Sequence, residues 1–254
     1  MRIVVLGGTG HIGRLVVERL ENSAQAVVVA SRRTGVDAVS GAGLASALDS
    51  ADAVIDVTNA PHPEGEGVLD FFTAMTSRVI EAELAAGVRH HVMLSIVGAE
   101  RGVPDGYFAA KAAQERIVAD SRMPHTILRS TQFFEFARSI AEWNTTRDTI
   151  HLPSTHVQPV AAADVADALV DTAGGAATDR AIDIAGPERM PLPAFVRRVL
   201  LADRDERFVV SDENVQTRGF NIASADLLPA DGAMLARTTL DDWIRQPVDA
   251  RTGR

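Results

Sequence analysis

Six short apolar runs alternate along the chain with longer stretches of helical periodicity. The runs are RIVVL (2–6), AVVVA (26–30), DAVIDV (52–57), HHVMLS (90–95), HTILR (125–129) and AIDIA (181–185). Runs that are apolar throughout are typical of strands buried on both faces. Between them, IGRLVVERLEN and LDFFTAMTSRVIEAELAAG carry apolar residues three and four positions apart, and the second ends at Gly87, a typical helix stop. This alternation predicts an α/β fold, with a doubly wound parallel sheet covered by helices on both faces.

Composition narrows the class of protein. The 254 residues are 46% hydrophobic, enough for one large domain that carries a small one. There is no cysteine, which excludes disulfides, thiolate metal sites and a cysteine nucleophile. A formal charge of -9 argues against a nucleic-acid partner. No apolar run approaches membrane-spanning length and no charged leader precedes RIVVL, so we expect a cytoplasmic protein with no membrane association.

A glycine-rich loop directly follows the first predicted strand. In VVLGGTGHIGRLVVERL, Gly7, Gly10 and Gly13 are spaced G-x-x-G-x-x-G at the mouth of the first predicted helix. A pyrophosphate needs a tight turn, a backbone without Cβ and a helix N-terminus with free N–H groups. The loop therefore predicts a Rossmann-type dinucleotide site. A glycine-rich turn with no ligand is the alternative. His11 lies inside the loop and is counted among its cofactor-binding positions without a role of its own.

The end of the second predicted strand bears on which dinucleotide is bound. Ser31, Arg32 and Arg33 stand there, and no acidic residue follows until Asp37. An Asp or Glu near this point binds a free ribose 2′-hydroxyl, whereas arginines suit a 2′-phosphate. We therefore predict NADP(H) in preference to NAD(H), with two solvated arginines on a loop as the alternative.

The one tyrosine and the one lysine of the chain lie four residues apart, at Tyr107 and Lys111. On a helix they share a face, and a positive charge beside a phenol lowers the phenol pKa and suits it to proton transfer. Ser95 ends the fourth predicted strand, at the edge that faces the ligand crevice, where its hydroxyl would polarise the same carbonyl. An ordinary surface helix with a half-buried tyrosine is the alternative.

Several motifs, in order, resemble those of a known family. They are GGTGHIG, SIVGAE, YFAAK, PHTILRSTQFFEF, PVAAADVADAL and IDIAGPE. In combination they resemble the short-chain dehydrogenase/reductase superfamily, and within it the atypical, NmrA-like NAD(P)H-binding branch, over about residues 1–245. The resemblance implies that Ser95 polarises a carbonyl, Tyr107 is the general acid/base and Lys111 binds the ribose and tunes the phenol.

The resemblance also implies the cofactor contacts, namely a phosphate loop of Gly7, Thr9, Gly10, Ile12 and Gly13, a ribose stretch of Thr58, Asn59 and Ala60, and a nicotinamide loop with Arg129 and Ser130. In one departure from the family, Ala42 stands where relatives often carry an aspartate that binds adenine. Candidate substrate contacts are Phe133, Phe134 and His62, although core packing is equally open for the phenylalanines and a plain loop position for the histidine. No metal site is predicted, because adjacent histidines such as His90 and His91 point to opposite faces of a strand.

The prolines beyond about residue 130 indicate a change of organisation. We expect an NAD(P)-binding Rossmann core over 1–150, mixed segments over 151–245 that complete the sheet and form a small substrate-side lobe, and a tail over 246–254. The predicted function is NADP(H)-dependent reduction or oxidation of a small organic carbonyl or quinone-like molecule by a monomer or homodimer. The alternatives are a non-catalytic NADP(H) sensor, and an epimerase or dehydratase that uses the cofactor internally.

Overall fold

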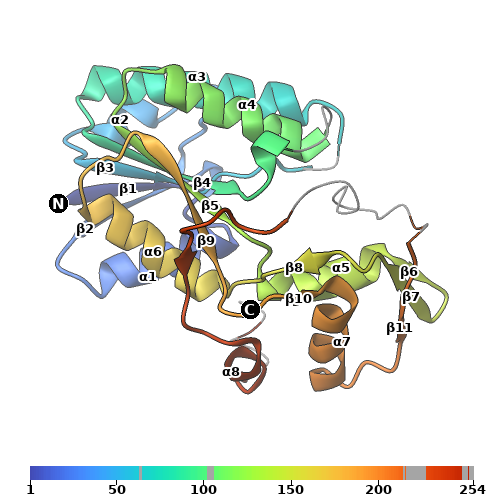
Figure 1. The fold of residues 1–254 in the computed structure, drawn as a ribbon. Helices are drawn as coiled ribbons and strands as arrows, with labels where there is room; N and C mark the ends of the chain where they lie inside the picture. Colours follow the sequence, from blue (N-terminus) through green and yellow to red (C-terminus); the bar gives the residue numbers. More distant parts are fainter. Residues whose placement is uncertain (63–64, 102–105, 214, 216–226, 248–250, 252–254) are drawn as a thin grey trace.

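The centre of the molecule is a seven-stranded parallel sheet with the strand order β12-β9-β5-β4-β3-β1-β2 (Figure 1). The computed structural model describes residues 1–62, 65–101, 106–213, 215, 227–247 and 251. The strands are β1 (Arg2–Leu6), β2 (Ala26–Ala30), β3 (Ala53–Asp56), β4 (His90–Ile96), β5 (His125–Ser130), β9 (Arg180–Ala185) and β12 (Met234–Leu235). All neighbours pair in parallel, and β2 and β3 flank β1 on opposite sides. The predicted Rossmann-type sheet is confirmed, and all six predicted strands are present.

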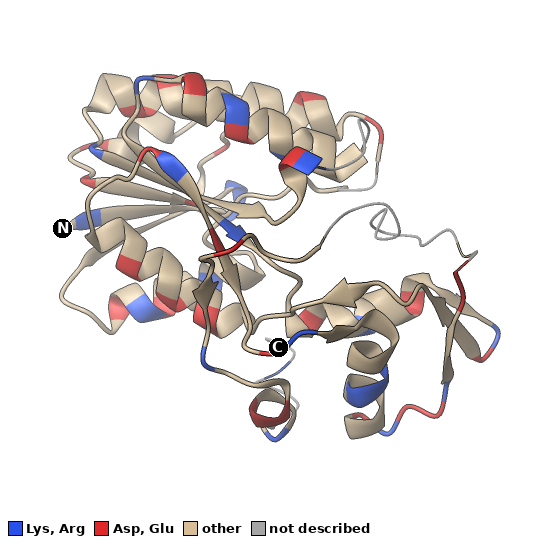
Figure 2. Cartoon of the chain, in the orientation of Figure 1, with Lys and Arg blue, Asp and Glu red and all other residues tan. Residues whose placement is uncertain are grey.

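Helices cover both faces of this sheet. Figure 1 shows α3 and α4 on one side of it and α1 and α6 on the other. The helices are α1 (His11–Glu21), α2 (Leu44–Leu48), α3 (Val68–Ala86), α4 (Gly106–Asp120) and α6 (Ala162–Gly174). Three short 3-10 helices, η1 (Arg32–Thr34), η2 (Ala99–Arg101) and η3 (Phe134–Phe136), follow strand ends. Figure 2 shows acidic and basic residues interspersed along these helices. The burial of the strands on both faces explains why their sequences are apolar throughout.

Local sequence accounts for the C-terminal end of α3. The helix ends at Gly87, which has the left-handed φ of 73° that glycine adopts without steric cost. Within its stretch LDFFTAM, Phe72 and Met75 are fully buried and Phe71 is half-buried, whereas Leu69, Asp70, Thr73 and Ala74 are exposed. The oligomeric state remains a prediction.

A second, smaller lobe is built from residues after β5. It contains α5 (Ala137–Trp143), α7 (Leu192–Ala202), a three-stranded sheet of β6 (Thr145–Thr146), β7 (Thr149–Leu152) and β11 (Phe208–Ser211), and the pair β8 (His156–Val157) and β10 (Met190–Pro191). Phe134, Phe195 and Trp243 are buried in its core. Residues 137–152, which straddle the predicted boundary at 150, pack into this lobe.

The C-terminal residues tie the lobe to the sheet. After β12 the chain forms α8 (Leu240–Ile244), and Arg251, in the stretch predicted as a tail, is buried, with its guanidinium 3.0 Å from Asp203 and against the Trp243 ring. Asp164 lies inside the first turn of α6 and accepts hydrogen bonds from Thr238. Within the described residues, no helix combines the length and apolar character needed to cross a bilayer.

Candidate active site

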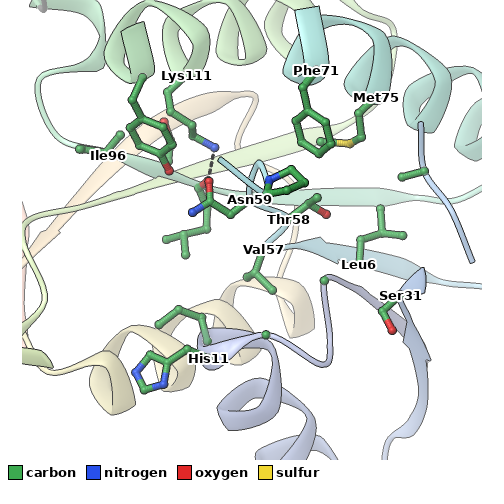
Figure 3. Close-up of a pocket in the computed structure, with 18 of the residues that line it drawn as sticks. Leu6, His11, Ser31, Val57, Thr58, Asn59, Phe71, Met75, Ile96 and Lys111 are labelled. Atoms are coloured by element: carbon green, nitrogen blue, oxygen red, sulfur yellow. Dashed lines mark hydrogen bonds between the residues drawn. The ribbon is translucent and has the colours of Figure 1, made fainter. Parts of the chain in front are cut away.

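One cavity of about 830 Å³ runs along the carboxyl ends of the parallel strands. This is the edge at which open α/β sheets bind ligands. The walls come from the glycine loop, the end of β2, the segment after β3, the end of β4, α3, α4 and the segment after β5. Figure 3 shows Lys111, Phe71 and Met75 on one side of this cavity and His11 on the other.

The glycine loop is held by close backbone packing. A Cβ on Gly13 would lie 2.2 Å from the Gly7 carbonyl oxygen, and a Cβ on Gly7 would lie 2.9 Å from the Val57 carbonyl oxygen. A Cβ on Gly10, by contrast, would have one close neighbour, the Gly7 carbonyl oxygen at 3.2 Å, and Gly10 lines the cavity. No side chain caps α1 at Gly10, so the first N–H groups of the helix are left for an anion.

Three buried polar atoms of the cavity wall lack a hydrogen-bond partner within the described part of the chain. They are His11 Nε2, Thr58 Oγ1 and Gln132 Oε1. Burial and the neighbouring Arg14 charge lower the pKa of His11 below its usual value, so the ring is neutral near pH 7. Buried polar groups without partners are costly in a native protein. A bound molecule with several hydrogen-bonding groups, such as a dinucleotide, fits this wall.

The residues after β2 form the far wall of the cavity. Ser31, Arg32 and Arg33, which the sequence predicts as cofactor contacts, all line it. Asp37 lines it as well, but its carboxylate accepts N–H groups from Val39 at 2.9 Å and from Ser40. These contacts, the Val39 bond foremost, lower the pKa of Asp37. The wall therefore combines two arginines with an aspartate whose carboxylate is already hydrogen-bonded to its own loop.

Ser95, Tyr107 and Lys111 line the same cavity, the serine from β4 and the other two from α4. Lys111 is buried, and its Nζ donates to the Leu94 carbonyl oxygen at 2.9 Å and to Gln114 Oε1. Burial lowers the pKa of Lys111 to about 8, although the Asp56 and Glu115 charges oppose this effect. The ammonium is therefore close to its titration point in slightly basic solution.

Tyr107 differs from the expectation in its acidity. Burial raises the pKa of Tyr107 well above its usual value, whereas the sequence predicted a pKa lowered by Lys111. The phenol ring packs edge-on against Phe72 at 6.0 Å, and the Lys111 ammonium lies over the same Phe72 ring at 4.8 Å. Desolvation of the phenolate outweighs any benefit of the nearby charge in this structure.

Ser95 and Arg129 belong to one partly buried polar cluster. The Ser95 hydroxyl donates to Glu115 Oε1 at 2.5 Å, and the Arg129 guanidinium donates to both oxygens of the same carboxylate. Arg129 also contacts Glu100 at 3.1 Å. Arg129 therefore does not line the cavity as predicted, because two carboxylates bind its guanidinium behind the wall, whereas the adjacent Ser130 does line it.

Four other predicted contacts lie off the wall. Gly13 and Ala60 pack behind it, and His62 is exposed on the loop beyond it. Phe134 is fully buried against Phe195 and Trp243 in the core of the small lobe, so it is a packing residue, as the helical spacing allowed. Of the predicted substrate contacts, only Phe133 lines the cavity.

The structure adds wall residues that sequence reasoning missed or assigned elsewhere. These are Phe71 and Met75 from α3, Gln132, Ile140 and Leu227 near the small lobe, and the loop Val36–Val39. Asp56 and Gln114 lie directly behind Lys111. The position of Asp56 at the carboxyl end of a predicted strand was a usable signal for it, whereas Gln114 had none beyond its helical neighbourhood.

Comparison with known proteins agrees with this architecture. A model of NAD(P)H-binding proteins matches residues 7–174. The chain belongs to the NAD(P)H-binding family. This confirms the family resemblance at the level of cofactor class and fold. The chain is also 33% identical to a (4-alkanoyl-5-oxo-2,5-dihydrofuran-3-yl)methyl phosphate reductase of Streptomyces griseus subsp. griseus. That alignment spans 205 residues and covers 73% of this chain and 68% of the reductase.

Solved structures of family-like fold extend over most of the chain. A UDP-N-acetylglucosamine 4-epimerase from Bacillus cereus superposes with a TM-score of 0.66 at 18% identity, over 84% of this chain and 85% of the epimerase. An NADPH-dependent quinone oxidoreductase from Escherichia coli, complexed with NADPH, gives 0.63 at 19% identity, over 89% of this chain and 87% of that one. At these identities, the similarity establishes the Rossmann-type fold.

Proposed function

We propose that this protein is an NADP(H)-dependent oxidoreductase of the short-chain dehydrogenase/reductase type, in the NmrA-like branch. Its substrate is a small organic carbonyl or quinone-like molecule. One observation carries the proposal: a single cavity is lined by the glycine loop, by Arg32 and Arg33, and by Tyr107 and Lys111. The reductase relative from Streptomyces griseus supports the reaction class.

The chemistry assigns one task to each end of the cavity. The uncapped N-terminus of α1 binds the pyrophosphate, and Arg32 and Arg33 pair with the 2′-phosphate. When bound, the nicotinamide supplies or accepts the hydride. Tyr107 remains protonated at neutral pH because burial raises its pKa, so in the reducing direction its hydroxyl gives a proton to the carbonyl oxygen.

The remaining groups support this proton transfer. Lys111 binds the ribose hydroxyls and stabilises the phenolate that Tyr107 leaves. Ser95, at the end of β4, is assigned to the reacting oxygen, toward which its one hydroxyl hydrogen must turn from Glu115 Oε1. The apolar side chains Ile96, Phe133 and Phe136 line the cavity and suit a substrate with a hydrophobic body.

Calorimetric titration with NADPH and NADH tests the cofactor assignment. We expect NADPH to bind more tightly, and Arg32→Ala to weaken NADPH binding about tenfold or more with little effect on NADH, because it removes a charge-assisted hydrogen bond. Arg116→Ala, which removes an exposed arginine of α4, is the matched control. Equal affinities for both nucleotides in the wild type would contradict the NADP(H) assignment.

Oxidation of NADPH with a panel of aldehydes, ketones and quinones tests the reaction. We expect Tyr107→Phe to lower kcat about a hundredfold or more while NADPH still binds, since the phenol supplies the proton. Undiminished turnover in that variant would remove Tyr107 from the mechanism. Cofactor binding without turnover on any substrate would support a sensor, and product formation without net NADPH oxidation would support an epimerase or dehydratase.

A further inference from the structure

Lys111 is the one lysine of the chain, and its ammonium lies in a buried polar chain behind the cavity. Lys111 donates to Gln114 Oε1, and Gln114 Nε2 donates to Asp56 Oδ2 at 3.2 Å. The other oxygen of Asp56 accepts the Thr58 N–H at 2.8 Å. All three hydrogen-bonded residues are buried, with exposed fractions of 3% for Lys111, 0% for Gln114 and 1% for Asp56.

The chemistry of the two ends determines the orientation of the Gln114 amide. An ammonium is only a donor and an ionised carboxylate is only an acceptor, so the amide oxygen faces Lys111 and the amide nitrogen faces Asp56. A flipped amide would lose both hydrogen bonds in a buried site. Asp56, itself anchored by the Thr58 backbone N–H, thus selects the one amide orientation whose oxygen accepts a hydrogen bond from Lys111.

The same contacts define where the ammonium points. An ammonium has three N–H donors. One goes to the Leu94 carbonyl oxygen at 2.9 Å, a second to Gln114, and the nitrogen lies 4.8 Å from the centre of the Phe72 ring. Lys111 also lines the cavity, so the donor not used by Leu94 and Gln114 is the one available to a ligand there.

We propose that Gln114 and Asp56 are positioning residues for Lys111: the amide, oriented by the carboxylate, fixes the ammonium beside the cavity and favours its protonated form. The role of Lys111 toward a ribose rests on the proposed function, whereas its placement by Gln114 and Asp56 does not. Gln114 and Asp56 themselves do not line the cavity. They act on a bound molecule only through Lys111.

Because the chain has one lysine, the protonation of Lys111 can be followed by nuclear magnetic resonance without assignment of overlapping signals. Protein labelled with ¹³C-lysine has a single Lys Cε resonance, and its shift against pH reports the Lys111 pKa without any turnover. The charged groups that face Lys111 are Asp56 from β3 and Glu115 from α4, with His91 of β4 beyond them in its buried pair with Glu83. Each variant is therefore compared with wild type over the same pH range.

We expect Gln114→Glu to raise the Lys111 pKa, because it places a carboxylate against the ammonium, and Gln114→Leu and Asp56→Asn to lower it. Gln158→Leu is the matched control, because the Gln158 amide donates to the Gly186 carbonyl oxygen and not to any group that contacts Lys111. This control should leave the Lys111 titration unchanged. We also expect Gln114→Leu to weaken NADPH binding about tenfold.

A merely structural Gln114 would not shift the pKa in opposite directions in the Glu and Leu variants. An unchanged Lys111 titration in folded Gln114→Glu and Gln114→Leu proteins overturns the proposal. If Gln114→Leu fails to fold, Gln114→Glu and the more conservative Gln114→Met decide it. The two proposals fail separately: loss of the Tyr107 role would leave these Cε titrations intact, and invariant titrations would leave NADPH oxidation intact.

Discussion

The single lysine shows how burial governs the chemistry of one residue. The pKa of Lys111 falls from 10.5 to about 8 because its ammonium is removed from water, and the Asp56 and Glu115 charges recover only part of the loss. Tyr107, one helical turn away, moves in the opposite direction for the same reason, because its charged form is the phenolate. The two groups are thus matched as a protonated donor and a cation at neutral pH.

Replacement of Lys111 by methionine tests the cost of this buried charge. The unfolded chain holds its lysine proton up to pH 10.5, whereas the folded one releases it near pH 8, so the contribution of Lys111 to stability rises with pH between these values. We expect the gain in stability of Lys111→Met over wild type to be largest at pH 7 and to shrink toward pH 10 by an amount on the order of 3 kcal/mol. Urea denaturation of both proteins at pH 7, 8.5 and 10 measures it. A gain that is constant across this range would show that Lys111 is not desolvated.

At the scale of elements, the loop between β1 and α1 separates two uses of glycine. Gly7 and Gly13 allow the strand, the loop and the helix to approach closely, while Gly10 leaves space on the cavity side.

Glu135 connects two helices at the small lobe, because its carboxylate accepts N–H groups from Trp243 in α8 and from Ala162 at the start of α6. Burial raises the pKa of Glu135 to about 7.

Two alanine substitutions in the loop should therefore have different consequences. Gly13→Ala should destabilise the fold itself by several kcal/mol, because its Cβ would overlap the Gly7 carbonyl oxygen at 2.2 Å. Gly10→Ala should fold with a near-normal melting temperature but bind NADPH at least about tenfold more weakly, since the new methyl group occupies the cavity wall. Thermal unfolding and calorimetric titration of the pair separate the two effects. Normal NADPH binding by a folded Gly10→Ala protein would move the pyrophosphate away from this loop.

At the scale of the whole molecule, the cavity is lined by both the central sheet and the small lobe. Its walls include Gly10 and Arg32 at the sheet edge, and also Ile140 and Leu227, which are buried in the core of the small lobe. Both tryptophans of the chain, Trp143 in α5 and Trp243 in α8, lie on the lobe side. A ligand in the cavity therefore contacts both parts, and its binding is reported by fluorescence from only one of them.

We expect NADPH to stabilise the small lobe together with the sheet. At one hundred times its dissociation constant it should raise the unfolding free energy by about 2.7 kcal/mol. Guanidinium titrations followed by tryptophan fluorescence and by far-ultraviolet circular dichroism should shift together. If circular dichroism shifts while tryptophan fluorescence does not, the lobe unfolds independently of the cofactor site.

The local pattern of residues was sufficient to predict the framework of the fold and the position of the site. Apolar runs predicted six strands of the central sheet, and Gly87 predicted a helix end. Gly7, Gly10, Arg32, Tyr107 and Lys111, which the sequence marked, all line one cavity. These signals are short-range. Strand burial, helical periodicity and backbone crowding act over a few residues, so they are readable along the chain.

Only the tertiary structure decided which side chains meet and how much water they lose. Gln114 and Asp56 are 58 positions apart, and Arg129 pairs with Glu115 across 14, so no local pattern predicted either contact. The burial of Phe134 away from the cavity and the raised pKa of Tyr107 likewise depend on the packing of distant elements. The sequence by itself determined the class of fold and placed a glycine loop after the first strand, because those follow from local patterns of residues. The protonation and partners of the reactive groups were decided by folding, because desolvation and long-range contacts exist only in the folded chain.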